Sequence, residues 1–98
     1  MAHRVSAEAG GDLDDIWSYV AGESGSTKRA DQLIQTLTRR FYLLSNYPFA
    51  GRSRPDLRAD LRSFPVGNYV ILYRIEHPDV RILRVFPSMR DISSYFLE

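Results

Sequence analysis

The sequence contains no cysteine, so disulfide bonds, thiolate metal sites and thiol catalysis are excluded. It has no apolar run long enough to cross a bilayer, and residues 1–16 lack the apolar core of a signal peptide. A net charge of only +1 argues against a protein held to nucleic acid mainly by phosphate contacts. These absences favour a soluble cytoplasmic protein with no membrane partner.

Lysine is also nearly absent, because Lys28 is the only lysine among 13 basic residues and the others are arginine. Residues 1–49 carry five bases and six acids, whereas residues 50–98 carry eight bases and six acids. Arginine suits bidentate contact with carboxylate or phosphate, although an arginine-rich codon bias would give the same ratio. The ratio alone therefore does not select a function.

The totals are those of one small globular domain that spans residues 1–98. A chain of 98 residues with 44% hydrophobic and 26% charged residues has enough apolar surface for a single modest core. There are no repeats and no low-complexity segment.

Two amphipathic helices are predicted in the first half, after a short strand at residues 2–5. Ser6 is a candidate N-cap for the first helix, and a loop is expected over residues 22–26. A longer helix should follow over residues 27–45 and end at a Pro/Gly-rich loop over residues 46–55. The apolar residues at helical spacing are, in the first helix, Ala9, Leu13, Ile16, Trp17 and Val20, and in the second, Ala30, Leu33, Ile34, Leu37, Phe41 and Leu44.

The second half is β in character, with strands predicted over residues 61–66, 69–76 and 80–86. Gly67–Asn68 can supply the positive φ of a tight hairpin, and Pro65 should place its end of the strand at an edge or bulge. Residues 88–98 are expected to form a short helix or a docked tail. The fold class is therefore α+β in the order β-α-α-β-β-β, a two-helix hairpin packed on a small antiparallel sheet.

Strict alternation assigns the side chains of the last two strands to the faces of the sheet. Tyr69 and Tyr73 share one face of their strand, and Arg74 lies on the other. In the last strand, Arg84 is predicted to share a face with Val80 and Ile82. Because two helices can cover only one face, the other should stay partly apolar and carry arginine or tyrosine, as protein-binding surfaces do.

Three segments resemble the ParE branch of the ParE/RelE toxins of type II toxin–antitoxin modules, from Val5 to about Ile92. They read "DLDDIWSYV", "YPFAGRSRPDLRADLRSFPVGNYVILYRI" and "VRILRVFPSMRDI". The most specific motifs are P-x-x-G-R (Pro48, Gly51, Arg52), L-R-S-F-P-V-G-x-Y (residues 61–69) and R-V-x-x-x-x-R-D (Arg84, Val85, Arg90, Asp91). One departure is Pro87, which stands where ParE-like chains usually carry histidine.

The resemblance implies a toxin that binds and poisons DNA gyrase and is neutralised by a ParD-like antitoxin, with no catalytic residues and no cofactor. It also implies that any contact with DNA is indirect, through the antitoxin or gyrase. RelE-type relatives instead cut messenger RNA on the ribosome, using an arginine directly after the tyrosine of the third strand. Here that position is Val70, which can neither contact a phosphate electrostatically nor move a proton. The alternatives are a nuclease that uses Arg62, Arg90 and Tyr95, or an antitoxin-binding fold whose toxicity has decayed.

Two sets of contact residues follow from the strand pattern and the resemblance. The antitoxin-binding candidates are Trp17, Tyr69, Tyr73, Arg74 and Arg84. The target-binding candidates are Arg52, Arg58, Arg62, Arg90, Asp91 and Tyr95. For the arginines of residues 52–62, exposed pairing with Asp56 and Asp60 is the alternative, and for Trp17 it is a place in the core.

No metal site is predicted. His3 and His77 are isolated in the sequence. The carboxylates of Asp12, Asp14 and Asp15 are expected to form a solvated helix face.

Overall fold

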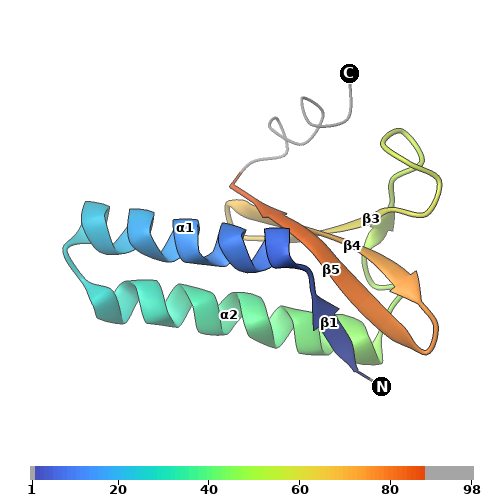
Figure 1. The fold of residues 1–98 in the computed structure, drawn as a ribbon, viewed down its shortest axis with the longest axis horizontal. Helices are drawn as coiled ribbons and strands as arrows, with labels where there is room; N and C mark the ends of the chain where they lie inside the picture. Colours follow the sequence, from blue (N-terminus) through green and yellow to red (C-terminus); the bar gives the residue numbers. More distant parts are fainter. Residues whose placement is uncertain (1, 88–98) are drawn as a thin grey trace.

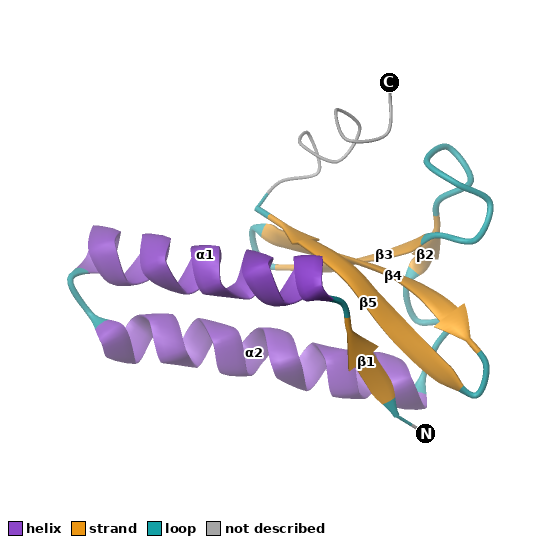
Figure 2. Cartoon of the chain, in the orientation of Figure 1, coloured by secondary structure: helices purple, strands orange, loops and turns teal. Residues whose placement is uncertain are grey.

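Two antiparallel helices lie across one face of a five-stranded sheet, and the helical hairpin extends past the end of the sheet (Figures 1 and 2). The computed structural model describes residues 2–87. The elements are β1 (His3–Val5), α1 (Ala7–Ser24), α2 (Thr27–Asn46), β2 (Arg52–Ser53), β3 (Arg62–Val66), β4 (Tyr69–Glu76) and β5 (Asp79–Phe86). The α+β class and the β-α-α-β-β-β order are confirmed, with the two-residue β2 as an addition.

The sheet is mixed rather than antiparallel. Its strand order is β1-β5-β4-β3-β2, and β1 runs parallel to β5 while the other neighbours are antiparallel. The predicted direction of the first strand is therefore wrong. Apolar alternation indicates that a strand exists, but it says nothing about the direction in which a short, sequence-distant strand joins its neighbour.

Serine caps define the starts of both helices. The Ser6 hydroxyl accepts a hydrogen bond from the Ala9 backbone N–H at 3.0 Å, and Ser26 does the same for Arg29 at 3.2 Å. α1 continues through Gly22 and ends at Gly25, whose φ of 66° is left-handed. The predicted loop over residues 22–26 is thus too long, because the helix tolerates Gly22 at a cost of about 1 kcal/mol.

The β3–β4 hairpin has the predicted two-residue turn. Val66 pairs with Tyr69, and between them Gly67 has a φ of 58°, the positive value that a tight hairpin needs. Pro65 lies beyond the end of the two-residue β2, so the missing N–H faces an unpaired edge of β3. The expected position of Pro65 at an edge is confirmed.

A bulge in β5 overturns the predicted face of Arg84. Leu72 pairs with Arg84 but the next residue, Tyr73, pairs with Ile82, so Leu83 is an extra residue in β5. Beyond this bulge the alternation is shifted by one position. Val85 therefore points toward the helices, while Arg84 leaves the face of Ile82 and lies on the opposite one.

Each face of the sheet has its own apolar cluster. The face toward the helices, here called the helix-covered face, contributes to the main core, whose buried members are Ala9, Ile16, Leu37, Phe41, Leu44, Val66, Ile71, Tyr73, Val80, Ile82 and Val85. On the opposite, helix-free face, Leu61, Val70, Leu72 and Phe86 form a second cluster, against which Leu57 and Leu83 pack. The β2–β3 loop supplies Leu57 and Leu61, so part of the face expected to stay open is covered.

Candidate functional site

A groove of about 580 Å³ crosses the helix-free face between the start of α1 and the β2–β3 loop. Its apolar lining comes from Leu61, Leu72, Leu83 and Phe86, and its charged lining from Glu8, Arg58, Asp60, Arg74, Arg81 and Arg84. Four arginines therefore face two carboxylates around an apolar floor. Two of these arginines are ion-paired with carboxylates outside the groove, Arg74 with Glu76 and Arg84 with Asp12.

Three arginines form a row across the strands on this face, here called the arginine row. Arg4 of β1 is in register with Arg81 of β5, and Arg81 is in register with Arg74 of β4. Arg74 binds Glu76 at 2.6 Å and lies 3.8 Å from Asp60, and Arg4 lies 3.9 Å from Asp79. Among residues 2–87, Arg81 has no hydrogen bond or ion pair, and it is only partly exposed.

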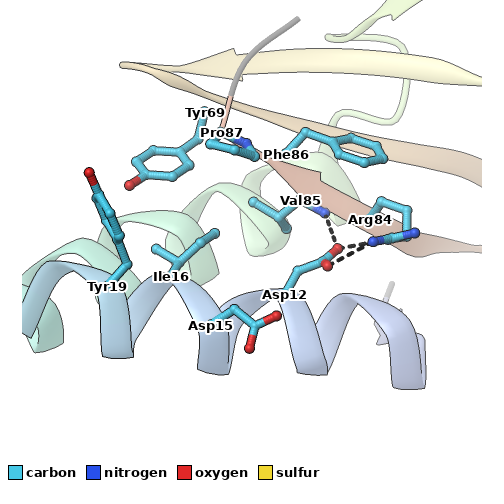
Figure 3. Close-up of a pocket in the computed structure, with 9 residues that line it drawn as sticks. All are labelled: Asp12, Asp15, Ile16, Tyr19, Tyr69, Arg84, Val85, Phe86 and Pro87. Atoms are coloured by element: carbon cyan, nitrogen blue, oxygen red, sulfur yellow. Dashed lines mark hydrogen bonds and ion pairs between the residues drawn. The ribbon is translucent and has the colours of Figure 1, made fainter. Parts of the chain in front are cut away.

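Arg84 is held by α1. Its guanidinium donates to both carboxylate oxygens of Asp12, at 2.8 and 2.9 Å, and one of these oxygens also accepts from the Val85 backbone N–H at 2.9 Å (Figure 3). The Arg84 guanidinium also lies over the Phe86 ring, 5.0 Å from its centroid. Asp12 therefore anchors the bulged end of β5 to α1, whereas Asp14 and Asp15 are exposed as expected.

A second, largely apolar hollow of about 500 Å³ lies beside this ion pair, between α1 and the ends of β4 and β5. Ile16 and Tyr19 of α1 face Tyr69 and Val85 across it, and Asp12 and Asp15 lie at its rim (Figure 3). Burial raises the pKa of the Tyr69 hydroxyl, and the neighbouring Tyr19 raises it further.

The P-x-x-G-R segment is fixed from within the sheet. The buried Tyr73 hydroxyl donates to the Pro48 carbonyl at 2.7 Å and accepts from the Gly51 N–H at 2.9 Å. A Cβ on Gly51 would collide with the Tyr73 ring and hydroxyl and lie 2.8 Å from the Ser63 carbonyl oxygen. Arg62 adds donors to the Gly51 carbonyl at 2.7 and 3.1 Å. Only glycine fits at this position of the motif.

This fixed loop presents two aromatic side chains that the sequence reasoning missed. Phe49 is 75% exposed and Tyr47 is 68% exposed, and Arg62 lies 5.2 Å from the centroid of the Phe49 ring. The signal available in the sequence was a pair of aromatics within a short Pro/Gly loop. The residues that contribute most of the binding energy at protein–protein interfaces are enriched in aromatics and arginine, as this loop is.

The antitoxin-binding candidates do not lie on one surface. Arg74 lines the groove, and Arg84 lies at the junction of the groove and the hollow. Tyr69 lines the hollow on the other side of the sheet. Tyr73 is fully buried and bound to the Pro48–Gly51 loop, so it is not available for contact with an antitoxin. Trp17 is outside the main core and donates from Nε1 to Asp31 at 2.8 Å, which joins the two helices.

The target-binding candidates are also divided. Arg52 and Arg58 are exposed, whereas Arg62 is partly buried and bound to loop carbonyls. The expected pairing with Asp56 involves Arg54, which donates to both Asp56 oxygens, at 3.0 and 2.8 Å, and thereby lowers the pKa of that carboxyl. Arg90, Asp91 and Tyr95 lie outside the described residues, as does the tail predicted over residues 88–98.

The described part of the chain offers no group of three metal-ligating side chains from histidine, cysteine, aspartate or glutamate. Within residues 2–87, neither helix is both long and apolar enough to cross a membrane. Val70, at the position where RelE-type nucleases carry arginine, is 4% exposed and belongs to the second apolar cluster.

Comparison with known proteins gives a consistent family. The family model described as "ParE toxin of type II toxin-antitoxin system, parDE" matches residues 4–92. Toxin ParE3 of Caulobacter vibrioides is 36% identical over 84 residues, which cover 86% of this chain and 83% of the relative. Toxin ParE1 of the same organism is 34% identical over 83 residues, which cover 85% of this chain and 84% of the relative.

The fold has a solved counterpart. The structure described as the chromosomal ParDE TA system from P. aeruginosa aligns with a TM-score of 0.78 over 90% of this chain and 96% of the matched chain, at 20% identity. That identity supports the fold alone, whereas the family model and the two Caulobacter relatives span most of the sequence. The chain therefore belongs to the ParE toxin family of type II toxin–antitoxin systems.

Proposed function

We propose that this protein inhibits cell growth by binding and poisoning DNA gyrase in the cytoplasm, and that a ParD-like antitoxin neutralises it by direct binding. In this proposal the protein is a binder and not an enzyme, and it needs no cofactor or metal. The family match supports a toxin with an antitoxin partner. The choice between gyrase poisoning and messenger cleavage depends on the helix-free face.

Val70 is the observation that carries this choice. Its side chain packs with Leu61, Leu72 and Phe86, so the position of the RelE-type arginine is occupied by a buried apolar residue. A nuclease lacking that cation would lose transition-state stabilisation of about 3 kcal/mol, judged from other charge-stabilising groups. Arg62, the described member of the alternative catalytic set, is bound to the Gly51 carbonyl.

The surface around the P-x-x-G-R loop is the proposed target contact. Phe49 and Tyr47 are exposed on a loop that the Tyr73 hydroxyl and Arg62 hold in place, so little ordering is required on binding. Arg52 is exposed next to this loop, and within residues 2–87 its side chain makes no hydrogen bond or close ion pair, although its charge helps to lower the pKa of the Asp56 carboxyl. An aromatic pair beside an exposed arginine suits recognition of a protein surface.

The test is a supercoiling assay with purified gyrase, run beside a translation extract programmed with messenger RNA. We expect loss of supercoiling, accumulation of cleaved DNA and intact messenger. Phe49→Ala and Arg52→Ala should weaken inhibition, and Arg39→Ala on the exposed side of α2 is the matched control. Full supercoiling at a large excess of the protein contradicts the gyrase target. Messenger cleavage would support the nuclease alternative.

A growth assay separates the remaining alternative. Expression without the antitoxin should stop growth, and co-expression should restore it. Normal growth without the antitoxin would instead favour a fold whose toxicity has decayed.

A further inference from the structure

Two side chains of the sheet hold the backbone of the loop that carries Phe49. The Tyr73 hydroxyl of β4 donates to the Pro48 carbonyl at 2.7 Å and accepts from the Gly51 N–H at 2.9 Å. The Arg62 guanidinium of β3 donates to the Gly51 carbonyl at 2.7 and 3.1 Å and to the Phe49 carbonyl at 3.4 Å. The loop is therefore bonded on both sides of Phe49.

Arg62 and Tyr73 act on the loop together because of their place in the sheet. They are directly opposite each other in the β3–β4 ladder, so their side chains lie on the same face. Tyr73 is fully buried and Arg62 is partly buried. Arg62 also lies 5.2 Å from the centroid of the Phe49 ring, so one guanidinium contacts both the loop backbone and the ring that the loop presents.

We propose that Arg62 and Tyr73 are positioning residues for the target contact. They do not touch the target, but they set the direction in which the Phe49 ring is presented to it. The inference rests on the proposed function, because it assumes that the Phe49 loop binds the target. It changes the role of Arg62, which sequence reasoning placed among the target-binding candidates, and it gives the buried Tyr73 a role in toxicity.

Loss of a positioning bond should weaken target binding without removing any contact. A loop that samples several orientations has to be ordered when it binds, and the entropy of ordering is subtracted from the affinity. Gly51 fits the same scheme, since its close approach to Tyr73 leaves no space for a Cβ. The loop, the glycine and the two sheet side chains therefore form one unit.

Tyr73→Phe is the first test, because it removes the hydroxyl and keeps the ring that packs in the core. In a supercoiling assay with purified gyrase, the concentration needed for half-maximal inhibition should rise about 10- to 30-fold. Tyr42→Phe is the matched control, because Tyr42 is exposed on α2 and its hydroxyl has no hydrogen bond within residues 2–87. It should stay within about twofold of wild type. Equal inhibition by Tyr73→Phe and wild-type protein overturns the proposal.

Amide hydrogen exchange of the free variant shows whether the change is confined to the loop. In Tyr73→Phe the Gly51 amide should exchange about 10- to 100-fold faster, because it loses its acceptor. The Tyr47 amide, which donates to the Leu43 carbonyl at 2.9 Å, should be unchanged. Faster exchange at both amides would assign the hydroxyl a merely structural role and contradict the inference.

A double-mutant cycle tests whether the hydroxyl acts through the ring. In a Phe49→Ala background, Tyr73→Phe should lose most of its effect on gyrase inhibition, because the side chain that it positions is absent. A structural role would give losses that add. Full additivity of the two losses therefore counts against a positioning role.

Arg62→Lys distinguishes positioning from direct contact. Lysine keeps the positive charge but lacks the two donors in fixed geometry that Arg62 directs at the Gly51 carbonyl. A positioning role predicts inhibition weakened by about 5- to 20-fold. Inhibition within about twofold of wild type would show that Arg62 acts through its charge at the target surface, and its assignment would be wrong.

Growth inhibition separates failure of this inference from failure of the proposed function. If wild-type protein leaves gyrase active, but Tyr73→Phe relieves growth arrest and Tyr42→Phe does not, the gyrase target is wrong and the positioning role stands. If wild-type protein and Tyr73→Phe inhibit gyrase and growth equally, the target stands and the inference is wrong.

Discussion

The two faces of the sheet differ in the side chains they present, although the same strands supply both. On the helix-covered face, Phe41 and Tyr73 are fully buried, and the Tyr73 hydroxyl both donates and accepts a hydrogen bond. On the helix-free face, four buried apolar residues lie beside a row of arginines. One face is built for packing, and the other keeps charge that packing does not need.

The bulge at Leu83 determines on which face of the sheet Arg84 and Val85 lie. Without it, Arg84 would continue on the side of Val80 and Ile82, inside the main core, where an arginine would need a buried partner. The extra residue turns Val85 into the core and carries Arg84 outward to Asp12. A single inserted residue thus lets one strand serve both a tightly packed and a charged surface.

The largest difference between the faces should appear on truncation of a large aromatic. Phe41→Ala should lower the free energy of unfolding by about 3–5 kcal/mol, because the surrounding core is closed on all sides. Phe86→Ala should cost about 2–3 kcal/mol, since the β2–β3 loop can settle into the vacated space. Urea unfolding of both variants measures this. Equal losses would mean that the helix-free cluster is as rigid as the main core.

The next largest effect is expected at the contact between the sheet and the P-x-x-G-R loop. Gly51→Ala should destabilise the protein by about 1–3 kcal/mol, because the new methyl group meets the Tyr73 side chain and the Ser63 carbonyl. Gly22→Ala is the control, since nothing lies within 4 Å of its Cβ position and α1 should gain up to about 1 kcal/mol. Opposite shifts in melting temperature would confirm the close approach at Gly51.

A smaller effect is expected where the two faces are joined. Asp12→Asn removes the charge that holds Arg84 but preserves the shape, so it should cost about 1–2 kcal/mol. Asp15→Asn, one turn away on the exposed side, should change stability by less than about 0.5 kcal/mol. Denaturant titration of both variants tests the claim. Equal small losses would show that the ion pair is not what fixes the bulged end of β5.

Sequence reasoning succeeded where one local pattern decides the outcome. The Ser6 cap, the helical spacing of Leu37, Phe41 and Leu44, and the Gly67 turn each follow from neighbouring residues. Strand existence and element order follow in the same way. The position of the groove-lining Arg74 also follows, because it lies outside the bulge and simple alternation holds there.

Apart from the loop predicted over residues 22–26, the failures involve contacts between residues far apart in sequence. No local pattern marks Leu83 as the extra residue, and its position is fixed only by pairing with β4 and by the carboxylate that Asp12 brings from α1. Tyr73 was expected on a binding face, because alternation cannot show that a loop many residues earlier would enclose its hydroxyl. The parallel direction of β1 was missed for the same reason.

The smallest effect on stability is expected at Phe49. Its effect on growth inhibition should be large by comparison. Phe49→Ala removes an exposed ring and its contact with Arg62, a loss of about 0.5 kcal/mol, and the loop keeps its bonds to Tyr73 and Arg62. Growth inhibition should nevertheless fall, because the proposed target contact includes the Phe49 ring. Growth inhibition at the wild-type level would show that the aromatic loop does not contact the target.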